Sequence, residues 1–120
     1  MVTTVKVAAA QIRPMLFSLD GSLQNVLKAM ADAAAEGVEL IVFPETFLPY
    51  YPYFSFVEPP VRMGRPHLAL YEQAVVVPGP VTDAVAAAAR QHGMQVLLGV
   101  NERDGGTLYN TQLLFNSCVL

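Results

Sequence analysis

Apolar residues in this chain gather in two kinds of segment, and the two kinds alternate along the sequence. Short, nearly continuous apolar runs are typical of strands that are buried on both faces. Three such runs cover residues 5–12, 38–43 and 94–100. Between the first two runs, apolar residues recur at helical spacing on one face, at Leu23, Val26, Leu27, Met30, Ala33 and Ala34. Asp20 or Ser22 can cap the start of this helix, and Gly37 can end it.

The second half of the chain predicts two more helices and a hairpin. A short helix is expected over residues 67–75, and a longer one over residues 81–93 with Thr82 as its N-cap candidate. The turn residues Asp104, Gly105 and Gly106 predict a hairpin that leads into a fourth strand at residues 107–115. The order β-α-β-loop-α-α-β-β predicts an α/β fold with a mixed sheet, in which the strands of the first βαβ unit are parallel.

Residues 44–66 break this regular pattern, because prolines and aromatic residues are concentrated there. Proline fixes φ and removes a backbone donor, so neither a regular helix nor a central strand is expected. Loops of this length in compact domains are usually functional or disordered, and the aromatic content argues against disorder. The segment is therefore predicted to be an ordered loop with a function.

The chain is also unusually apolar for its length. Hydrophobic residues make up 53% of its 120 residues and charged residues only 14%, against about 25% charged in an ordinary domain. A chain of this size buries only about two-thirds of its unfolded surface. The excess apolar surface is therefore expected to be covered either by copies of the chain, in a homo-oligomer, or by the rest of a larger fold.

Charge and cysteine content exclude several classes of protein. The net charge of −3 and the pI near 5.2 argue against a nucleic-acid-binding surface. No apolar run reaches the ~18 residues that a membrane helix needs, and the N-terminal segment reads as a strand rather than a signal peptide. A single cysteine, Cys118, excludes an internal disulfide and fits a reducing compartment. We therefore expect a cytoplasmic protein with no nucleic-acid or membrane partner.

Glu45 is the one carboxylate at the head of the aromatic and proline-rich segment. It follows the second predicted strand, and ligands in open α/β sheets bind outside the carboxyl ends of strands. Phe43 and Phe47 are expected to surround it with apolar atoms, and Pro44 and Pro49 to hold it stiffly. These features alone leave two interpretations open, a general base and a helix-capping or surface residue.

The stretch GVELIVFPETFLPYYP resembles a strand signature of the nitrilase branch of the carbon–nitrogen hydrolase superfamily. That signature has a Gly, two aliphatic residues, an aromatic residue, the Glu, an aliphatic residue and a Tyr-Pro pair. The matching residues are Gly37, Leu40, Ile41, Phe43, Glu45, Leu48, Tyr51 and Pro52. Tyr50 replaces the usual Gly before Tyr-Pro, which is similar to the aliphatic-nitrilase subgroup. The stretches VAAAQI, VPGPVT and HGMQVLLGVNERDGGTLYNTQLLFN extend the resemblance over nearly the whole chain.

The resemblance implies a fold and a chemistry. The fold is an α-β-β-α sandwich, and the chemistry is hydrolysis of a small nitrile to a carboxylic acid and ammonia by a Glu-Lys-Cys triad, through a covalent thioimidate and without metal or organic cofactor. By resemblance Glu45 is the general base, and Tyr51 and Phe56 line the substrate pocket. The stretch PYYPYFSF, again by resemblance, favours a nitrile over the other substrates of the superfamily.

The catalytic lysine and cysteine of that family have no counterpart in this chain. Lys6 and Lys28 lie at positions that do not match, and Cys118 lacks the Trp-Glu pair that follows the family's nucleophile. We therefore expect residues 1–120 to be the N-terminal part of a single carbon–nitrogen hydrolase domain, inactive by itself. Two other interpretations stay open: an amidase or N-carbamoyl hydrolase of the same superfamily, and a non-catalytic truncated α/β module that binds a partner or itself.

Four polar residues outside the signature have structural interpretations. His67 is expected in a loop or a helix start, and His92 at a helix C-terminus, which favours a cation. Asn101 and Glu102 follow the third predicted strand on the same side as Glu45. For these two residues a supporting role beside Glu45 and a purely structural role both stay open.

Overall fold

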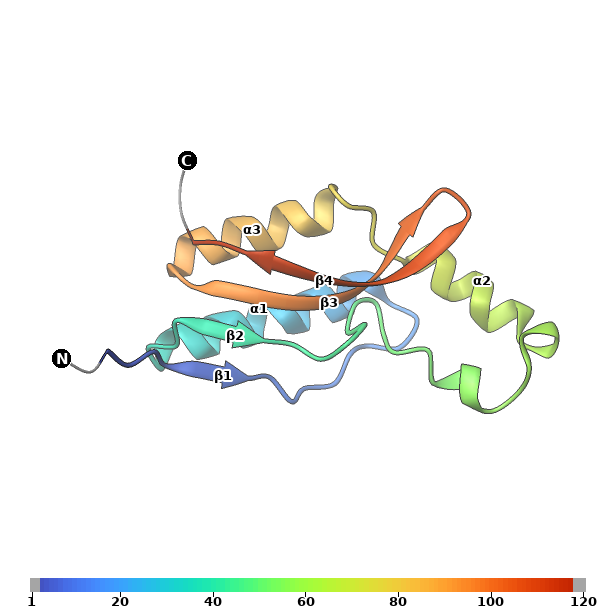
Figure 1. The fold of residues 1–120 in the computed structure, drawn as a ribbon, viewed down its shortest axis with the longest axis horizontal. Helices are drawn as coiled ribbons and strands as arrows, with labels where there is room; N and C mark the ends of the chain where they lie inside the picture. Colours follow the sequence, from blue (N-terminus) through green and yellow to red (C-terminus); the bar gives the residue numbers. More distant parts are fainter. Residues whose placement is uncertain (1–2, 118–120) are drawn as a thin grey trace.

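The computed structural model describes residues 3–117 and has the predicted order of strands and helices (Figure 1). The strands are β1 (Val7–Ala9), β2 (Leu40–Val42), β3 (Gln95–Asp104) and β4 (Thr107–Phe115). The α-helices are α1 (Leu19–Ala35), α2 (Gly64–Gln73) and α3 (Pro80–His92). Two short 3₁₀ helices, η1 (Tyr53–Phe56) and η2 (Pro60–Arg62), lie in the proline-rich segment. The α/β class is confirmed.

The four strands form one mixed sheet in the order β1-β2-β3-β4. β1, β2 and β3 are parallel to one another, and β4 is antiparallel to β3, so the predicted mixed sheet is confirmed. β1 and β2 are shorter than the apolar runs that predicted them. β3 instead runs on to Asp104, which pairs with Thr107 across the two-residue turn of Gly105 and Gly106. Gly105 has φ +57°, the left-handed conformation that glycine adopts readily.

Both predicted N-caps are wrong, and proline and hydroxyl chemistry explain why. α1 begins after Ser18, whose hydroxyl accepts a hydrogen bond from the backbone N–H of Gly21 at 3.0 Å. Ser22 uses its hydroxyl instead to bind the backbone of Met15, at 2.8 and 3.0 Å. α3 begins at a proline, which is favoured at the first helical position. Its N-cap is therefore the preceding glycine, whose N–H donates to the hydroxyl of Thr82 at 2.9 Å.

Helices α1 and α3 contact each other and cover one face of the sheet (Figure 1). The core between them is apolar and is built from residues such as Val26 and Met30 of α1, Val85 and Ala89 of α3, and Ile41, Val96 and Leu98 of the sheet. Side chains alternate along a strand, so the intervening residues point to the opposite face. That face is open, and Val7 and Leu114 are 55% and 67% exposed. The structure is thus one sheet-and-helix half of the expected α-β-β-α sandwich.

The proline-rich segment contains η1 and η2 and extends beyond one end of the sheet, where it leads into α2 (Figure 1). α2 starts earlier than predicted because Pro66 falls in its first turn, where a missing N–H costs nothing. It ends before Val75 because the backbone of Val75 joins β3: its N–H donates to Asn101 O, and its carbonyl accepts from Arg103 N, both at 2.8 Å. Within residues 3–117, no helix combines the length and the apolarity needed to cross a membrane.

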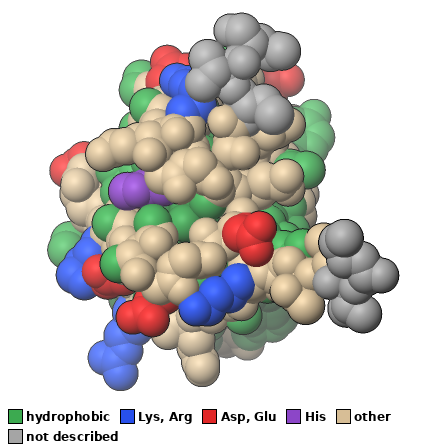
Figure 2. All heavy atoms as spheres, turned by 90° about the vertical axis from the view of Figure 1, so that its left-hand side faces the viewer, with side chains coloured by type: hydrophobic (Ala, Val, Ile, Leu, Met, Phe, Trp, Pro, Cys, Tyr) green, Lys and Arg blue, Asp and Glu red, His purple; other side chains and the backbone are tan. Residues whose placement is uncertain are grey.

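The opposite end of the molecule, turned toward the viewer in Figure 2, carries charged side chains of both signs scattered among hydrophobic ones. No large patch of a single charge gathers on that face. Two cavities border the segment that follows the carboxyl end of β2.

Candidate active site at Glu45

Glu45 lies in a tight turn that packs directly on β3. The turn follows β2, and Thr46 within it has φ +44°. Beneath it lies Gly99, where an added Cβ would be 2.3 Å from the carbonyl oxygen of Pro44, 2.6 Å from Thr46 N and 2.9 Å from Glu45 Cα. Only a residue without a side chain permits so close an approach of the two backbones. Gly99 therefore fixes how closely the Glu45 turn sits against the sheet.

Asn101 holds the segment that follows this turn against β3. It is 6% exposed, and its side-chain amide donates to the carbonyls of Tyr50 at 3.0 Å and Leu48 at 3.3 Å, with Thr46 O at 3.5 Å. Its backbone N–H also donates to Leu48 O at 2.7 Å. Asn101 lies inside β3, not after it, and it holds the loop backbone without touching the Glu45 carboxylate. Asn101 therefore supports the loop that carries Glu45, which is the first of the two roles left open for it.

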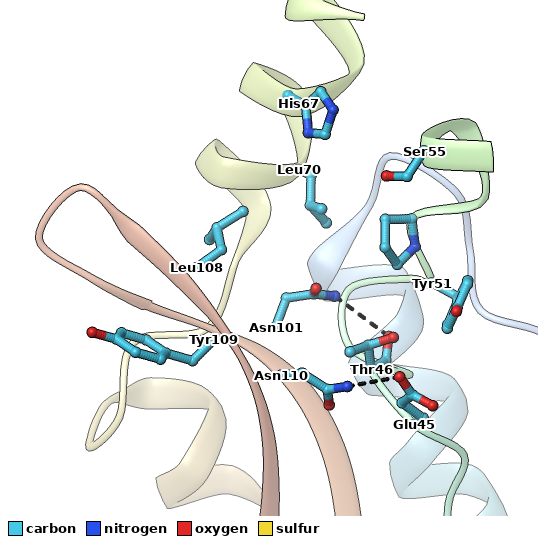
Figure 3. Close-up of a pocket in the computed structure, with 11 residues that line it drawn as sticks. Glu45, Thr46, Tyr51, Ser55, His67, Leu70, Asn101, Leu108, Tyr109 and Asn110 are labelled. Atoms are coloured by element: carbon cyan, nitrogen blue, oxygen red, sulfur yellow. Dashed lines mark hydrogen bonds between the residues drawn. The ribbon is translucent and has the colours of Figure 1, made fainter. Parts of the chain in front are cut away.

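The Glu45 carboxylate is exposed, with its Oε1 accepting a hydrogen bond from Asn110 Nδ2 at 2.7 Å (Figure 3). The apolar surroundings expected from Phe43 and Phe47 are found only in part. Both rings are buried and pack on each other, with centroids 5.8 Å apart, but Phe47 also lines a cavity that Glu45 borders. The turn sends these two rings into the core and leaves the carboxylate outside it. Glu45 therefore stands at the rim of the sheet, where a ligand can reach it.

Sequence reasoning did not single out Asn110, although one signal could have found it. A two-residue turn fixes the register of a hairpin, and counting back from Gly105 and Gly106 pairs Asn110 with Asn101. An amide opposite Asn101 must lie at the same edge of the sheet as Glu45. The register of the hairpin thus predicts the contact that the strand pattern alone did not.

Glu45 borders two cavities. The first, of about 310 Å³, is an open pocket lined by the Glu45 turn, the proline-rich segment, α2, β3 and β4 (Figure 3). Its lining residues are Glu45, Thr46, Tyr51, Pro52, Ser55, His67, Leu70, Asn101, Leu108, Tyr109 and Asn110. The second, of about 330 Å³, is lined mainly by apolar side chains, at Ile12, Pro14, Pro44, Glu45, Phe47, Tyr51 and Tyr53. Each has the volume of a small-molecule site, and Glu45 lines both. The first has more polar side chains in its lining and is called the polar cavity below; the second is called the apolar cavity.

Of the two predicted pocket residues, the structure brings only Tyr51 to Glu45. Tyr51 lines both cavities, and its ring is stacked on that of Phe56 with centroids 6.1 Å apart and an angle of 7°. Phe56 is 77% exposed and lines neither cavity. A substrate contact for Phe56 stays a prediction, and in this structure Phe56 supports Tyr51.

The two histidines and Glu102 have different surroundings. His67 lies in α2 and lines the polar cavity; its ring packs edge-on against Phe54 at 4.8 Å, and its buried Nε2 has no hydrogen-bond partner among the described residues. His92 is the last residue of α3, as predicted. Glu102 lies in β3, accepts a hydrogen bond from Thr111 at 2.9 Å and lines neither cavity. Of these residues, only His67 shares a cavity with Glu45.

The other titratable candidates lie elsewhere. Lys6 binds the carbonyl of Glu36, and Lys28 pairs with Asp32 at 2.7 Å, so neither lysine borders a Glu45 cavity. Cys118 lies outside the described residues. Within residues 3–117, no three His, Cys, Asp or Glu side chains are grouped so that they could hold a metal ion. Burial raises the pKa of Tyr50, whose ring packs against Phe17.

Comparison with solved structures supports the fold. Among solved structures, the fold matches a glutamine-dependent NAD(+) synthetase from Cytophaga hutchinsonii with a TM-score of 0.61, at 19% identity, over 96% of this chain and 17% of that one. A glutamine-dependent NAD+ synthetase from Acinetobacter baumannii matches with a TM-score of 0.59, at 20% identity, over 94% of this chain and 19% of that one. At these identities the likeness shows the fold alone.

Curated relatives are more similar in sequence. A nitrilase from Paraburkholderia phymatum is 62% identical over 93% of this chain, and a protein named nitrilase 3 from an unknown prokaryotic organism is 53% identical over 94%. An aliphatic nitrilase from Rhodococcus rhodochrous is 37% identical over 95%. The chain spans about a third of the length of these relatives, namely 33%, 35% and 31%. The carbon–nitrogen hydrolase family model matches residues 6–118. With a family match that includes the Glu45 turn and both strands that support it, the chain belongs to the carbon–nitrogen hydrolase family.

Proposed function

We propose that this chain supplies the general base of a nitrilase, which converts a small organic nitrile to a carboxylic acid and ammonia. The observation that carries the proposal is the place of Glu45, whose carboxylate stands between two cavities on a turn held to β3 by Gly99 and Asn101. The names of the similar curated proteins support the nitrile as substrate. In this proposal residues 1–120 are the N-terminal part of one domain, and the chain is inactive by itself.

The hydrogen bonding of the carboxylate leaves one oxygen available for the proposed role of a general base. Asn110 donates a hydrogen bond to Oε1, whereas Oε2 accepts no hydrogen bond from the described residues. In the proposed reaction Glu45 takes the proton of a cysteine thiol, and the thiolate attacks the nitrile carbon to form a thioimidate. Glu45 passes that proton to the nitrile nitrogen and can then take a proton from water, which adds to the thioimidate carbon. Glu45 returns this proton to the nitrogen, so ammonia leaves and a thioester remains. A second water, activated by Glu45 in the same way, releases the acid and regenerates the thiol. The cysteine, and the lysine that stabilises the developing charge, belong to the rest of the domain.

The two cavities give the reacting groups separate approaches to one carboxylate. The apolar cavity, with Phe47 and Tyr53 in its wall, suits the organic substituent of a nitrile. The polar cavity, with Ser55, His67 and Asn110, suits water and ammonia. Tyr51 lies between them and would contact the substrate from the side of the proline-rich segment.

The test is a chimera in which residues 6–117 of this chain replace the matching segment of the P. phymatum nitrilase. Glu45→Gln preserves size and hydrogen bonding but removes the base, so kcat for ammonia release should fall ~10²–10⁴-fold. The matched control is Glu102→Gln, which changes a carboxylate of β3 that lines neither cavity and should leave kcat unchanged.

Two outcomes would contradict the proposal. If folded Glu45→Gln kept more than about a tenth of the parent turnover, above the low end of a lost general base, Glu45 would be structural. If the chimera released ammonia from amides or N-carbamoyl compounds but not from nitriles, the amidase or carbamoyl-hydrolase interpretation would replace this one.

A further inference from the structure

We propose that Asn110 is a positioning residue for Glu45. Its side-chain amide fixes Oε1 of the carboxylate, so that Oε2 is the oxygen that faces the reacting atoms and exchanges protons. The inference rests on the proposed function of Glu45 as a base and assigns the two carboxylate oxygens different tasks.

The contact is short and has the right chemistry. Asn110 Nδ2 lies 2.7 Å from Glu45 Oε1, within the range of hydrogen bonds to a charged acceptor. Glu45 is exposed and its side chain has several rotatable bonds, so without a partner the carboxylate would sample many positions. A base that samples many positions spends less time in line with its proton donor. The amide of Asn110 restricts the carboxylate to the wall between the two cavities.

Asn110 and Asn101 act on the same turn from opposite strands. They form a cross-strand pair in the β3–β4 hairpin, and Figure 3 shows both side chains directed toward the Glu45 turn. The buried Asn101 donates side-chain hydrogen bonds to the backbone carbonyls of Leu48 and Tyr50, which follow the turn. The exposed Asn110 holds the carboxylate itself. One strand pair thus fixes both the backbone that carries the base and the rotamer of the base.

An amide is well suited to this task, because it donates a hydrogen bond without carrying a charge. It neither exchanges protons with Glu45 nor places a full positive charge beside it. The carboxylate is therefore oriented while it stays the only carboxyl group among the residues that line the two cavities.

The experiment compares three variants of the chimera with the parent. Asn110→Ala should lower kcat on the order of 10-fold to 100-fold, as expected when a catalytic group is misplaced by ~1 Å, and leave KM within about threefold. Asn110→Asp places a second carboxyl group beside Glu45, so the pair retains a proton and the acid limb of the pH–kcat profile should move to higher pH. Gln112→Ala removes an exposed amide from the same face of β4 and should change neither.

A purely structural role of Asn110 would lower the thermal midpoint of Asn110→Ala without a selective fall in kcat. The shift in Asn110→Asp tests whether residue 110 lies beside the Glu45 carboxylate, since His67 and the tyrosines of the cavities are the same in parent and variants. The positioning role is wrong if Asn110→Ala keeps more than half of the parent kcat and Asn110→Asp leaves the pH–kcat profile unchanged. If Glu45→Gln loses turnover in the same experiments, the proposed function still stands. If Glu45→Gln keeps turnover, the proposed function itself fails.

Crystal structures of the chimera decide the contact whether or not the protein is active. In the parent, Glu45 Oε1 should lie within hydrogen-bond distance of Asn110 Nδ2, and in Asn110→Ala the carboxylate should occupy more than one position. A single, unmoved carboxylate in Asn110→Ala would overturn the inference.

Discussion

Replacing Gly99 by alanine should push the Glu45 turn away from the sheet. The new Cβ would meet three backbone atoms and no flexible side chain, and the shortest of these distances is 2.3 Å, to the carbonyl oxygen of Pro44. Ordinary van der Waals contact begins near 3.4 Å, so the turn must move by about 1 Å. The displacement cannot be absorbed locally, because the hydrogen bonds of Leu48 and Asn101 tie the next residues to β3.

Two quantities should change together. Overpacking of this kind typically costs ~1–3 kcal/mol of unfolding free energy. A shift of ~1 Å in a catalytic group can cost on the order of 10²-fold in rate. We therefore expect Gly99→Ala in the chimera to lower both the thermal midpoint and kcat for ammonia release, with the larger relative effect on kcat.

The matched control is Gly106→Ala in the hairpin turn, where an added Cβ meets nothing within 4 Å. This variant should keep the parent kcat and thermal midpoint. The reasoning is refuted if Gly99→Ala shows kcat within about twofold of the parent at an unchanged midpoint, since the 10²-fold effect of a ~1 Å shift would then be absent.

Two further predictions concern stability. Asn101→Leu removes the side-chain donor of the Tyr50 carbonyl and should lower the unfolding free energy by ~1–3 kcal/mol in urea titrations; an unchanged midpoint would contradict the role of Asn101. Burial raises the pKa of Tyr50 above its ordinary 10.0, so the unfolded state ionises first and stability is lost as the pH rises past about 10. Tyr50→Phe should remove this pH-dependent loss of stability, so its urea midpoint should fall less between pH 9 and pH 11 than that of the parent. An equal fall in both proteins would show that Tyr50 is not responsible.

The fold was predictable because its signals are local. Apolar runs, a helical stripe and a Gly-Gly turn each depend on neighbouring residues, and they yield the element order and the mixed sheet that the structure shows. The N-cap prediction for α1 was wrong for a similarly local reason: several hydroxyl and carboxyl side chains lie near the helix start, and the sequence does not say which one faces the free N–H groups. Ser18, not Asp20 or Ser22, is so placed.

The site was less predictable because it depends on contacts between distant segments. The place of Glu45 after a strand followed from its neighbours in the sequence, but its exposure did not. Nothing near residue 45 indicates that the turn rests on Gly99 or that the carboxylate meets Asn110, since both contacts arise only when β3 and β4 are in place. The same holds for Phe56, whose ring is directed at Tyr51 and not at the cavities.

The hairpin between β3 and β4 makes the position of Asn110 beside Glu45 sensitive to insertions and deletions at a remote point. Asn110 faces Glu45 because the two-residue turn at Gly105 and Gly106 sets the strand register. Inserting one residue before Asn110 and keeping the pairing would move its side chain to the other face of the sheet. Length variation among related enzymes should therefore be tolerated at this surface turn only in steps that restore the register, even though the turn itself touches no substrate.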